Sequence, residues 1–110
     1  MSFVIANNLT GPLPLDIPFN PPLDGPVTIA FSGSAWASVS NTLIGVDVLL
    51  DGALLGTALL YSNQTQEHRT LPTQFFASKL SDGAHTITLR ATNANTTSDA
   101  NDFYSLWIID

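Results

Sequence analysis

The sequence predicts an all-β protein that folds as a single antiparallel β-sandwich over residues 1–110. Its apolar residues make up 45% of the chain and fall in short runs separated by turn residues, a spacing typical of strands in a sandwich or barrel. No run approaches the roughly 18 apolar residues of a membrane-spanning helix. Several runs are apolar on both faces, although a small antiparallel sheet normally leaves one face in water. A second copy of the same chain is the simplest cover for the extra apolar face.

Composition and charge disfavour several classes of function. Nine acidic and three basic residues give a net charge of −6, which opposes binding to nucleic acid and to anionic lipid. The chain has no cysteine, so neither a disulfide nor a thiolate metal site is available. The first residues lack the basic and apolar regions of a secretory signal. We therefore expect a soluble protein without membrane insertion, either cytoplasmic or released as part of an assembly.

Residues 1–26 are expected to form an extended, proline-rich arm. Six of the seven prolines lie between Pro12 and Pro26, and each removes a backbone donor that a helix or a central strand needs. Apolar side chains between the prolines indicate that the arm is docked on a sheet edge or on a partner, because a free linker is polar. These side chains are Leu13, Leu15, Ile17, Phe19 and Leu23.

The sandwich strands are expected over residues 27–110. Residues 27–38 alternate apolar or small side chains with hydroxyl side chains, which predicts a half-buried strand with Trp36 on the non-core face. Residues 43–50 and 53–61 are both apolar and are joined by Asp-Gly at 51–52. Asp-Gly is a strong signal for a type I′ hairpin turn, because both central positions of that turn need positive φ.

Three more strands complete the predicted sandwich. Residues 71–80 place Phe75 and Phe76 on opposite faces of a strand. Residues 85–92 alternate cleanly between apolar and polar side chains and predict an ordinary half-exposed strand. Residues 103–110 carry large apolar side chains on both faces. We therefore expect the second apolar face of this last strand to be covered by another surface.

Four segments from Gly25 onward carry a resemblance to a known family: GPVTIAFSGSAWA, IGVDVLLDGALLGT, FFASKLSDGAHTITL and NDFYSLWIID. Their order resembles the tumour-necrosis-factor-like jelly roll, which also forms the globular heads of complement-type proteins. The resemblance implies a homotrimer that recognises a protein or a sugar without catalysis. The pair VDVLLDGALLGTA and LSDGAHTITLRATNA is also similar to bacterial immunoglobulin-like modules. The strands with two apolar faces favour the jelly roll.

The last strand is the expected site of contact between subunits. In the family that the chain resembles, an aromatic-rich C-terminal strand fills the centre of the trimer. The expected interface residues are Tyr104, Leu106, Trp107 and Ile108. Burial in the core of a single subunit is the alternative for Trp107.

Carbohydrate recognition is the function that the residue chemistry favours, with a structural, fibre-tip or adhesin role acting through self-assembly as the alternative. A sugar needs an aromatic ring for its apolar face and polar groups for its hydroxyls, and loops on a rigid scaffold commonly carry such groups. The candidate rings are Trp36, Tyr61, Tyr104 and Trp107. The predicted ligand-binding residues are Trp36, Tyr61, Asn63, Gln66, His68, Arg69, Asn93 and Asn95.

Catalysis is the function class that the sequence supports least, and no organic cofactor is expected. The nucleophile elbow G-x-S-x-G is absent. Neither His68 nor His85 has a nucleophile at a spacing that suggests a catalytic triad. Asp99, Asn101 and Asp102 offer oxygen-bearing side chains of the kind that calcium prefers. A turn in which these side chains cap backbone amides is the alternative.

Overall fold

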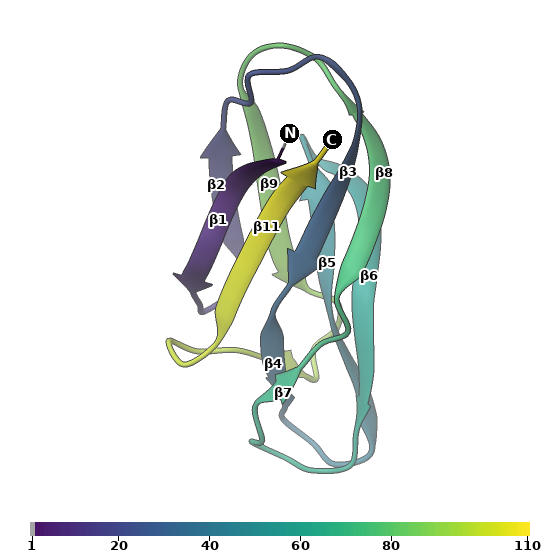
Figure 1. Cartoon of the computed structure of the whole chain (residues 1–110). Helices are drawn as coiled ribbons and strands as arrows, with labels where there is room; N and C mark the ends of the chain where they lie inside the picture. The colour runs from purple at the N-terminus through teal and green to yellow at the C-terminus, as the bar shows by residue number, and fades with distance from the viewer. Residues whose placement is uncertain (1) are drawn as a thin grey trace.

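The computed structural model describes residues 2–110 and contains two four-stranded antiparallel sheets that face each other (Figure 1). Sheet I has the order β1 (Ser2–Thr10), β11 (Phe103–Ile109), β3 (Gly25–Ser32) and β8 (Gln74–Leu80). Sheet II has the order β2 (Leu15–Phe19), β9 (His85–Ala91), β5 (Thr42–Leu50) and β6 (Ala53–Ser62). A small third sheet consists of β10 (Thr96–Thr97), β4 (Ser34–Ala37) and β7 (Arg69–Thr70). Within residues 2–110, no helix is long and apolar enough to cross a membrane.

The chain alternates between the two large sheets as it proceeds. Among the eight long strands, every connection crosses from one sheet to the other except the β5–β6 hairpin. An eight-stranded double sheet connected in this way is a jelly roll. The fold class predicted from the sequence is therefore confirmed.

The β5–β6 hairpin has the turn that the sequence predicts. Leu50 pairs with Ala53, so Asp51 and Gly52 are the two central residues. Their φ angles are 50° and 86°, and a type I′ turn needs positive values at both positions. This turn sets the pairing of Leu50 with Ala53 and of Leu49 with Leu54, and the register shifts by one residue between Leu49 and Val48.

The core lies between the two large sheets and is built from alternate side chains of each strand. From sheet I it takes the fully buried Ile29, Phe31, Tyr104, Leu106 and Ile108. From sheet II it takes the fully buried Ile44, Val46, Val48, Ile87 and Leu89. Each buried side chain of this size contributes about 1.5–3 kcal/mol through removal of apolar surface from water.

The core contains most of the residues that were expected between subunits. Tyr104, Leu106 and Ile108 are fully buried within their own chain, so none of them is accessible to a partner. Trp107 alternates with them and lies on the outer face of sheet I, where it pairs with Val4 on one side and Ala30 on the other. Of the four expected contact residues, Trp107 alone faces outward.

The proline-rich segment is built into the sandwich as two edge strands. β1 lies at the edge of sheet I and β2 at the edge of sheet II. An edge strand tolerates Pro18 because one row of its backbone groups has no ladder partner. Ile17 and Phe19 are buried in the core, which is the docking that the apolar residues of this segment indicated.

Gly33 separates β3 from β4, where the sequence predicted one continuous strand. A Cβ atom at this position would lie 2.5 Å from Cδ1 of Tyr104 and 2.9 Å from Cζ of Phe31. Both rings belong to the core. The backbone of Gly33 thus packs directly against the Tyr104 ring, and a side chain would have no room there.

We predict that Gly33→Ala lowers the free energy of unfolding by about 1–3 kcal/mol, because overpacking a tight core forces side chains out of their preferred positions. Urea denaturation measures the effect. Ser32→Ala is the matched control, since Ser32 lies on the outer side of the same strand opposite Ser105, and its change should stay within about 0.5 kcal/mol. Equal stability of the two variants would contradict the packing constraint.

His85 connects the β5–β6 turn to the turn before β9. Its Nδ1 lies 2.6 Å from Oδ2 of Asp51, and its Nε2 lies 2.6 Å from the carbonyl oxygen of Ser81. The other oxygen of Asp51 accepts the Thr86 N–H at 2.9 Å. Both ring nitrogens face acceptors, and only the doubly protonated ring can donate to both. The hydrogen bond to Asp51, followed by that to the Ser81 carbonyl, raises the pKa of His85.

The raised pKa makes this connection dependent on pH. Because the folded-state pKa lies above the unfolded value of about 6.5, the stabilisation is complete below that pH and disappears as the pH rises through the folded-state pKa. On the acid side, the His85 hydrogen bond lowers the pKa of Asp51. The contribution of Asp51 is therefore lost only as the pH falls through that lowered value.

We predict that the wild-type melting temperature falls more between about pH 5.5 and about pH 9 than that of His85→Gln, because only the wild type loses the His85 cation over that range. Thermal unfolding followed by circular dichroism at both pH values gives the comparison. The same pH response in both proteins would show that His85 contributes no pH-dependent stability.

Candidate functional site

The loops that follow β4, β6 and β9 gather at one end of the sandwich, away from both chain termini (Figure 1). β4 forms the middle of the small sheet there, between β10 and β7. Ala35 and Ala37 of β4 are fully buried on the core side. Their neighbours Ser34 and Trp36 therefore point to the other side of the strand, toward the loops.

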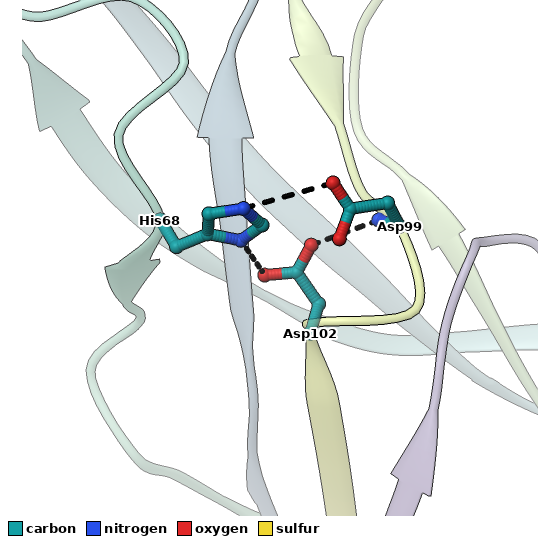
Figure 2. A group of neighbouring side chains, drawn as sticks. All are labelled: His68, Asp99 and Asp102. Carbon is teal, nitrogen blue, oxygen red and sulfur yellow. Dashed lines mark hydrogen bonds and ion pairs between the residues drawn. The ribbon is translucent and has the colours of Figure 1, made fainter.

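A cluster of titratable side chains forms where these loops meet. His68 comes from the loop before β7, and Asp99 and Asp102 come from the loop before β11 (Figure 2). Their ligand-capable atoms all lie within 4.8 Å of one another. The Trp36 ring lies beside the imidazole, with a centroid separation of 6.2 Å. These four residues come from three distant parts of the sequence, and we call them the loop-end cluster.

Asp102 is the buried centre of this cluster. Its side chain is fully buried, and Oδ1 accepts hydrogen bonds from the Ser34 hydroxyl at 2.6 Å and from His68 Nδ1 at 2.8 Å. Oδ2 accepts the Asp99 N–H at 2.9 Å. The hydrogen bond that His68 donates to Asp102 raises the pKa of His68, against the opposing effect of desolvation.

The cluster does not form a nucleophile–base pair. Ser34 donates to Asp102, whereas a serine nucleophile must be aligned with the imidazole that takes its proton. His68 instead directs Nδ1 to Asp102 and Nε2 toward Asp99. The geometry supports hydrogen bonding or ligation at Nε2 rather than acyl transfer.

A second group of predicted residues lies on the outer face of sheet II. Tyr61 pairs with Leu43, and the next row in the same direction pairs Leu59 with Gly45. Tyr61, Leu43 and Leu59 are all exposed. The Asn93 side chain at the edge of this patch donates to the Leu43 carbonyl at 3.0 Å. An aromatic and aliphatic surface is thus bordered by a fixed amide.

A network around Asp47 continues this surface along the strands. Asp47 Oδ1 accepts from the hydroxyls of Thr57 and Thr92, each at 2.8 Å, and Oδ2 accepts from Arg90 Nε at 3.1 Å. Burial by itself raises the pKa of Asp47, but the hydrogen bonds from Thr92, Thr57 and Arg90 hold it below its ordinary value. Asp47 therefore stays ionised and holds Arg90 in place.

Sequence reasoning did not select Asp47 or Arg90. The available signal was one aspartate within the apolar run 43–50, since an isolated charge in a buried strand needs a partner. Arg90, one of three basic residues in the chain, is the partner directly opposite Asp47.

The structure divides the residues predicted to bind a ligand between two surfaces. Trp36 and His68 lie in the loop-end cluster, and Arg69 lies beside them in β7, opposite Ala35 of β4. Tyr61 and Asn93 lie on the outer face of sheet II. The Asn95 side chain donates to the Thr42 hydroxyl, and Asn63 and Gln66 are exposed in the loop between β6 and β7.

The predicted calcium ligands are engaged by hydrogen bonds within their own loop and, at Asp102, by Ser34 and His68 from other segments. Asp102 uses both carboxylate oxygens as acceptors. Asn101 contributes its backbone N–H, which donates to Asp99 Oδ1 at 2.8 Å. Asp99 Oδ2 lies 3.6 Å from His68 Nε2. The capping arrangement that the sequence left open is therefore present in this loop.

No family model matches the chain, and no curated protein matches its sequence. Solved structures do share its fold. The C-terminal domain of EclA, described as a sugar-binding protein, has a TM-score of 0.54 and 18% identity, covering 99% of this chain and 76% of that one. The CBM36-1 domain of a multidomain xylanase from the hindgut metagenome of Trinervitermes trinervoides has a TM-score of 0.51 and 14% identity, covering 100% and 98%.

Two further structures show the same similarity. A family 35 carbohydrate-binding module from Clostridium thermocellum has a TM-score of 0.50 and 13% identity, covering 99% of this chain and 88% of that one. A β-glucosidase from Paenibacillus barengoltzii has a TM-score of 0.59 and 14% identity. The match covers 99% of this chain but 10% of that enzyme.

The chain therefore has a β-sandwich fold that is also found in carbohydrate-binding modules. At 13–18% identity the similarity concerns the fold. None of these four structures is described as a tumour-necrosis-factor-like or complement-type protein. That resemblance stays a prediction from the sequence.

We predict that Asp102→Asn lowers the free energy of unfolding by about 1–3 kcal/mol, because the amide nitrogen would face groups that donate to the carboxylate and would leave a buried polar group unpaired. Urea denaturation at neutral pH measures the loss. Asp99→Asn is the control, because its half-exposed side chain should change stability by no more than about 0.5 kcal/mol. Wild-type stability of Asp102→Asn would show that Asp102 does not organise the loops.

Proposed function

We propose that this protein is a non-catalytic carbohydrate-binding module that binds through the outer face of sheet II. The observation that carries the proposal is the exposed ring of Tyr61. Of the four candidate aromatic side chains, Tyr104 is fully buried and Trp36 and Trp107 are partly buried, whereas Tyr61 is 54% exposed. A ring that stacks on a sugar must offer one open face, and Tyr61 has the most exposed surface.

The surroundings of Tyr61 suit an oligosaccharide. Leu43 and Leu59 extend the apolar surface beside the ring, and Asn93 lies at its edge. Two residues along a strand span about 7 Å, so the surface from the Tyr61 row to the Asp47 row is about 14 Å long. A strip with an aromatic ring at one end and an anchored arginine at the other suits a chain of several sugar units.

Charge favours a neutral glycan over a polyanionic one. The net charge of −6 repels a polyanion at long range, and Arg90, the basic residue of this surface, is already paired with Asp47. The free N–H groups of the Arg90 guanidinium remain donors for sugar hydroxyls.

The state of Asp47 supports binding without hydrolysis. A glycosidase needs a carboxylic acid with a raised pKa to protonate the leaving oxygen. Asp47 has a lowered pKa, and both of its oxygens accept hydrogen bonds within the protein. It therefore anchors Arg90 and is unsuited to act as a general acid.

We also propose self-association through the outer face of sheet I, as the structural alternative. In this face Val4, Trp107, Ala30 and Phe75 form one row across all four strands. Phe75 is 64% exposed, and Val4 and Ile109 are also exposed. An apolar sheet face of this kind commonly marks a contact surface, and a homotrimer is one assembly that would cover it.

We predict that Tyr61→Ala weakens oligosaccharide binding at least tenfold, because removal of a stacking ring costs more than about 1.4 kcal/mol in binding free energy. A glycan array identifies the ligand, and isothermal titration calorimetry then compares the variants.

Phe75→Ala is the matched control, since it removes a ring that is also more than half exposed, from the opposite sheet. It should leave glycan binding unchanged and reduce any oligomer seen by sedimentation. If Phe75→Ala abolishes glycan binding while Tyr61→Ala does not, the binding face is sheet I. If no glycan binds the wild type, the carbohydrate proposal fails.

A further inference from the structure

In the loop-end cluster two ligand atoms face each other across a long ion pair, His68 Nε2 and Asp99 Oδ2. Asp102 accepts from His68 Nδ1, so a neutral imidazole carries its proton on Nδ1 and has a lone pair on Nε2. Asp99 Oδ1 accepts the Asn101 N–H at 2.8 Å, so Oδ2 is the carboxylate oxygen that faces His68 Nε2. Both side chains reach solvent, with exposed fractions of 37% for His68 and 44% for Asp99.

The separation of these two atoms matches joint ligation of one cation. His68 Nε2 and Asp99 Oδ2 are 3.6 Å apart, which is longer than a good hydrogen bond. Zinc–nitrogen and zinc–oxygen bonds are about 2.0–2.2 Å long, so two ligands at a tetrahedral angle lie roughly 3.4 Å from each other. A small adjustment of either exposed side chain would bring both atoms to bonding distance.

We propose that His68 and Asp99 bind a divalent transition metal ion of the zinc class, with Asp102 as the group that orients the imidazole. A carboxylate that accepts the other ring N–H fixes the orientation of a ligating histidine and strengthens it as a ligand. Here that carboxylate is buried and held by Ser34 and by the Asp99 backbone. The orienting group is therefore in place before any ion arrives.

The ligand set distinguishes this site from the predicted calcium site. Calcium takes six to eight oxygen ligands, whereas one imidazole nitrogen and one carboxylate oxygen suit zinc and its neighbours. With two protein ligands, the remaining positions of the ion are open to water or to oxygen atoms of another molecule. The site thus binds an ion accessible from solvent and does not depend on the proposed glycan surface of sheet II.

The test titrates the purified wild-type protein with zinc sulfate alone, by isothermal titration calorimetry and by NMR of the histidine ring nitrogens. We expect one ion per chain and a shift of the His68 signals. The His85 signals serve as an internal control, because both nitrogens of His85 are engaged by Asp51 and Ser81. His68→Ala and Asp99→Asn should each weaken binding at least tenfold, and His85→Gln should leave it unchanged.

Asp102→Asn tests the positioning role. We expect zinc affinity to fall about 10–100-fold, together with a change in the proton distribution between the two His68 nitrogens that a loss of stability alone would not produce. If this variant does not fold, the exposed His68 and Asp99 variants still decide the proposal.

Three results would overturn the proposal: no zinc binding by the wild type, wild-type affinity in His68→Ala, or shifts at His85 instead of His68. A parallel titration with calcium chloride provides a fourth. Calcium binding that exceeds zinc binding and survives His68→Ala would show an all-oxygen site. Loss of glycan binding in Tyr61→Ala has no bearing on these results, so the two proposals fail separately.

Discussion

Asp102 connects four separate segments of the chain at one end of the sandwich, through its buried side chain and its backbone carbonyl. Its side chain accepts from Ser34 of β4, from His68 of the loop before β7 and from the backbone of Asp99. Its own carbonyl oxygen accepts the Gly11 N–H from the turn between β1 and β2 at 2.9 Å. A buried polar group is costly unless it is hydrogen-bonded. The hydrogen bonds that satisfy this one buried side chain thus position the loops.

At the opposite end of the molecule a carboxylate again connects separate segments, although there the Asp51 side chain is half exposed. Asp51 and His85 connect two turns there, and Asp47 and Arg90 pair on the face of sheet II between the two ends. The chain has only 12 charged residues, and these two pairs use Asp47, Asp51 and Arg90 among them. The large apolar remainder fills the core and covers the outer face of sheet I.

The sequence predicted the features that depend on neighbouring residues. Period-two alternation placed Ile87 and Leu89 in the core, and Asp-Gly at 51–52 located the hairpin turn, because both signals are local. The last strand was harder, since both of its faces carry large apolar side chains and the outer one is marked by a single small polar residue, Ser105. The alternation of the strand places Trp107 and Tyr104 on opposite faces. Only the packing of the two sheets shows which of these faces lies in the core. The assignment of Tyr104, Leu106 and Ile108 to a subunit contact followed from that ambiguity.

The candidate site was predictable in its residue types and not in its grouping. His68 and Asp102 are 34 residues apart, and Asp47 and Arg90 are 43 apart, so each pairing depends on strand order. The break between β3 and β4 at Gly33 likewise depends on the ring of Tyr104, which belongs to the last strand of the chain.

The pairing of β1 with β11 brings the two ends of the chain side by side. Ser2 lies opposite Ile109, and Figure 1 places both ends away from β4 and β7. A short linker would therefore join them, which is the geometry that permits circular permutation or insertion of a whole domain into another protein. This jelly roll can be grafted into a host loop through its two ends, with the loop-end cluster directed away from the host.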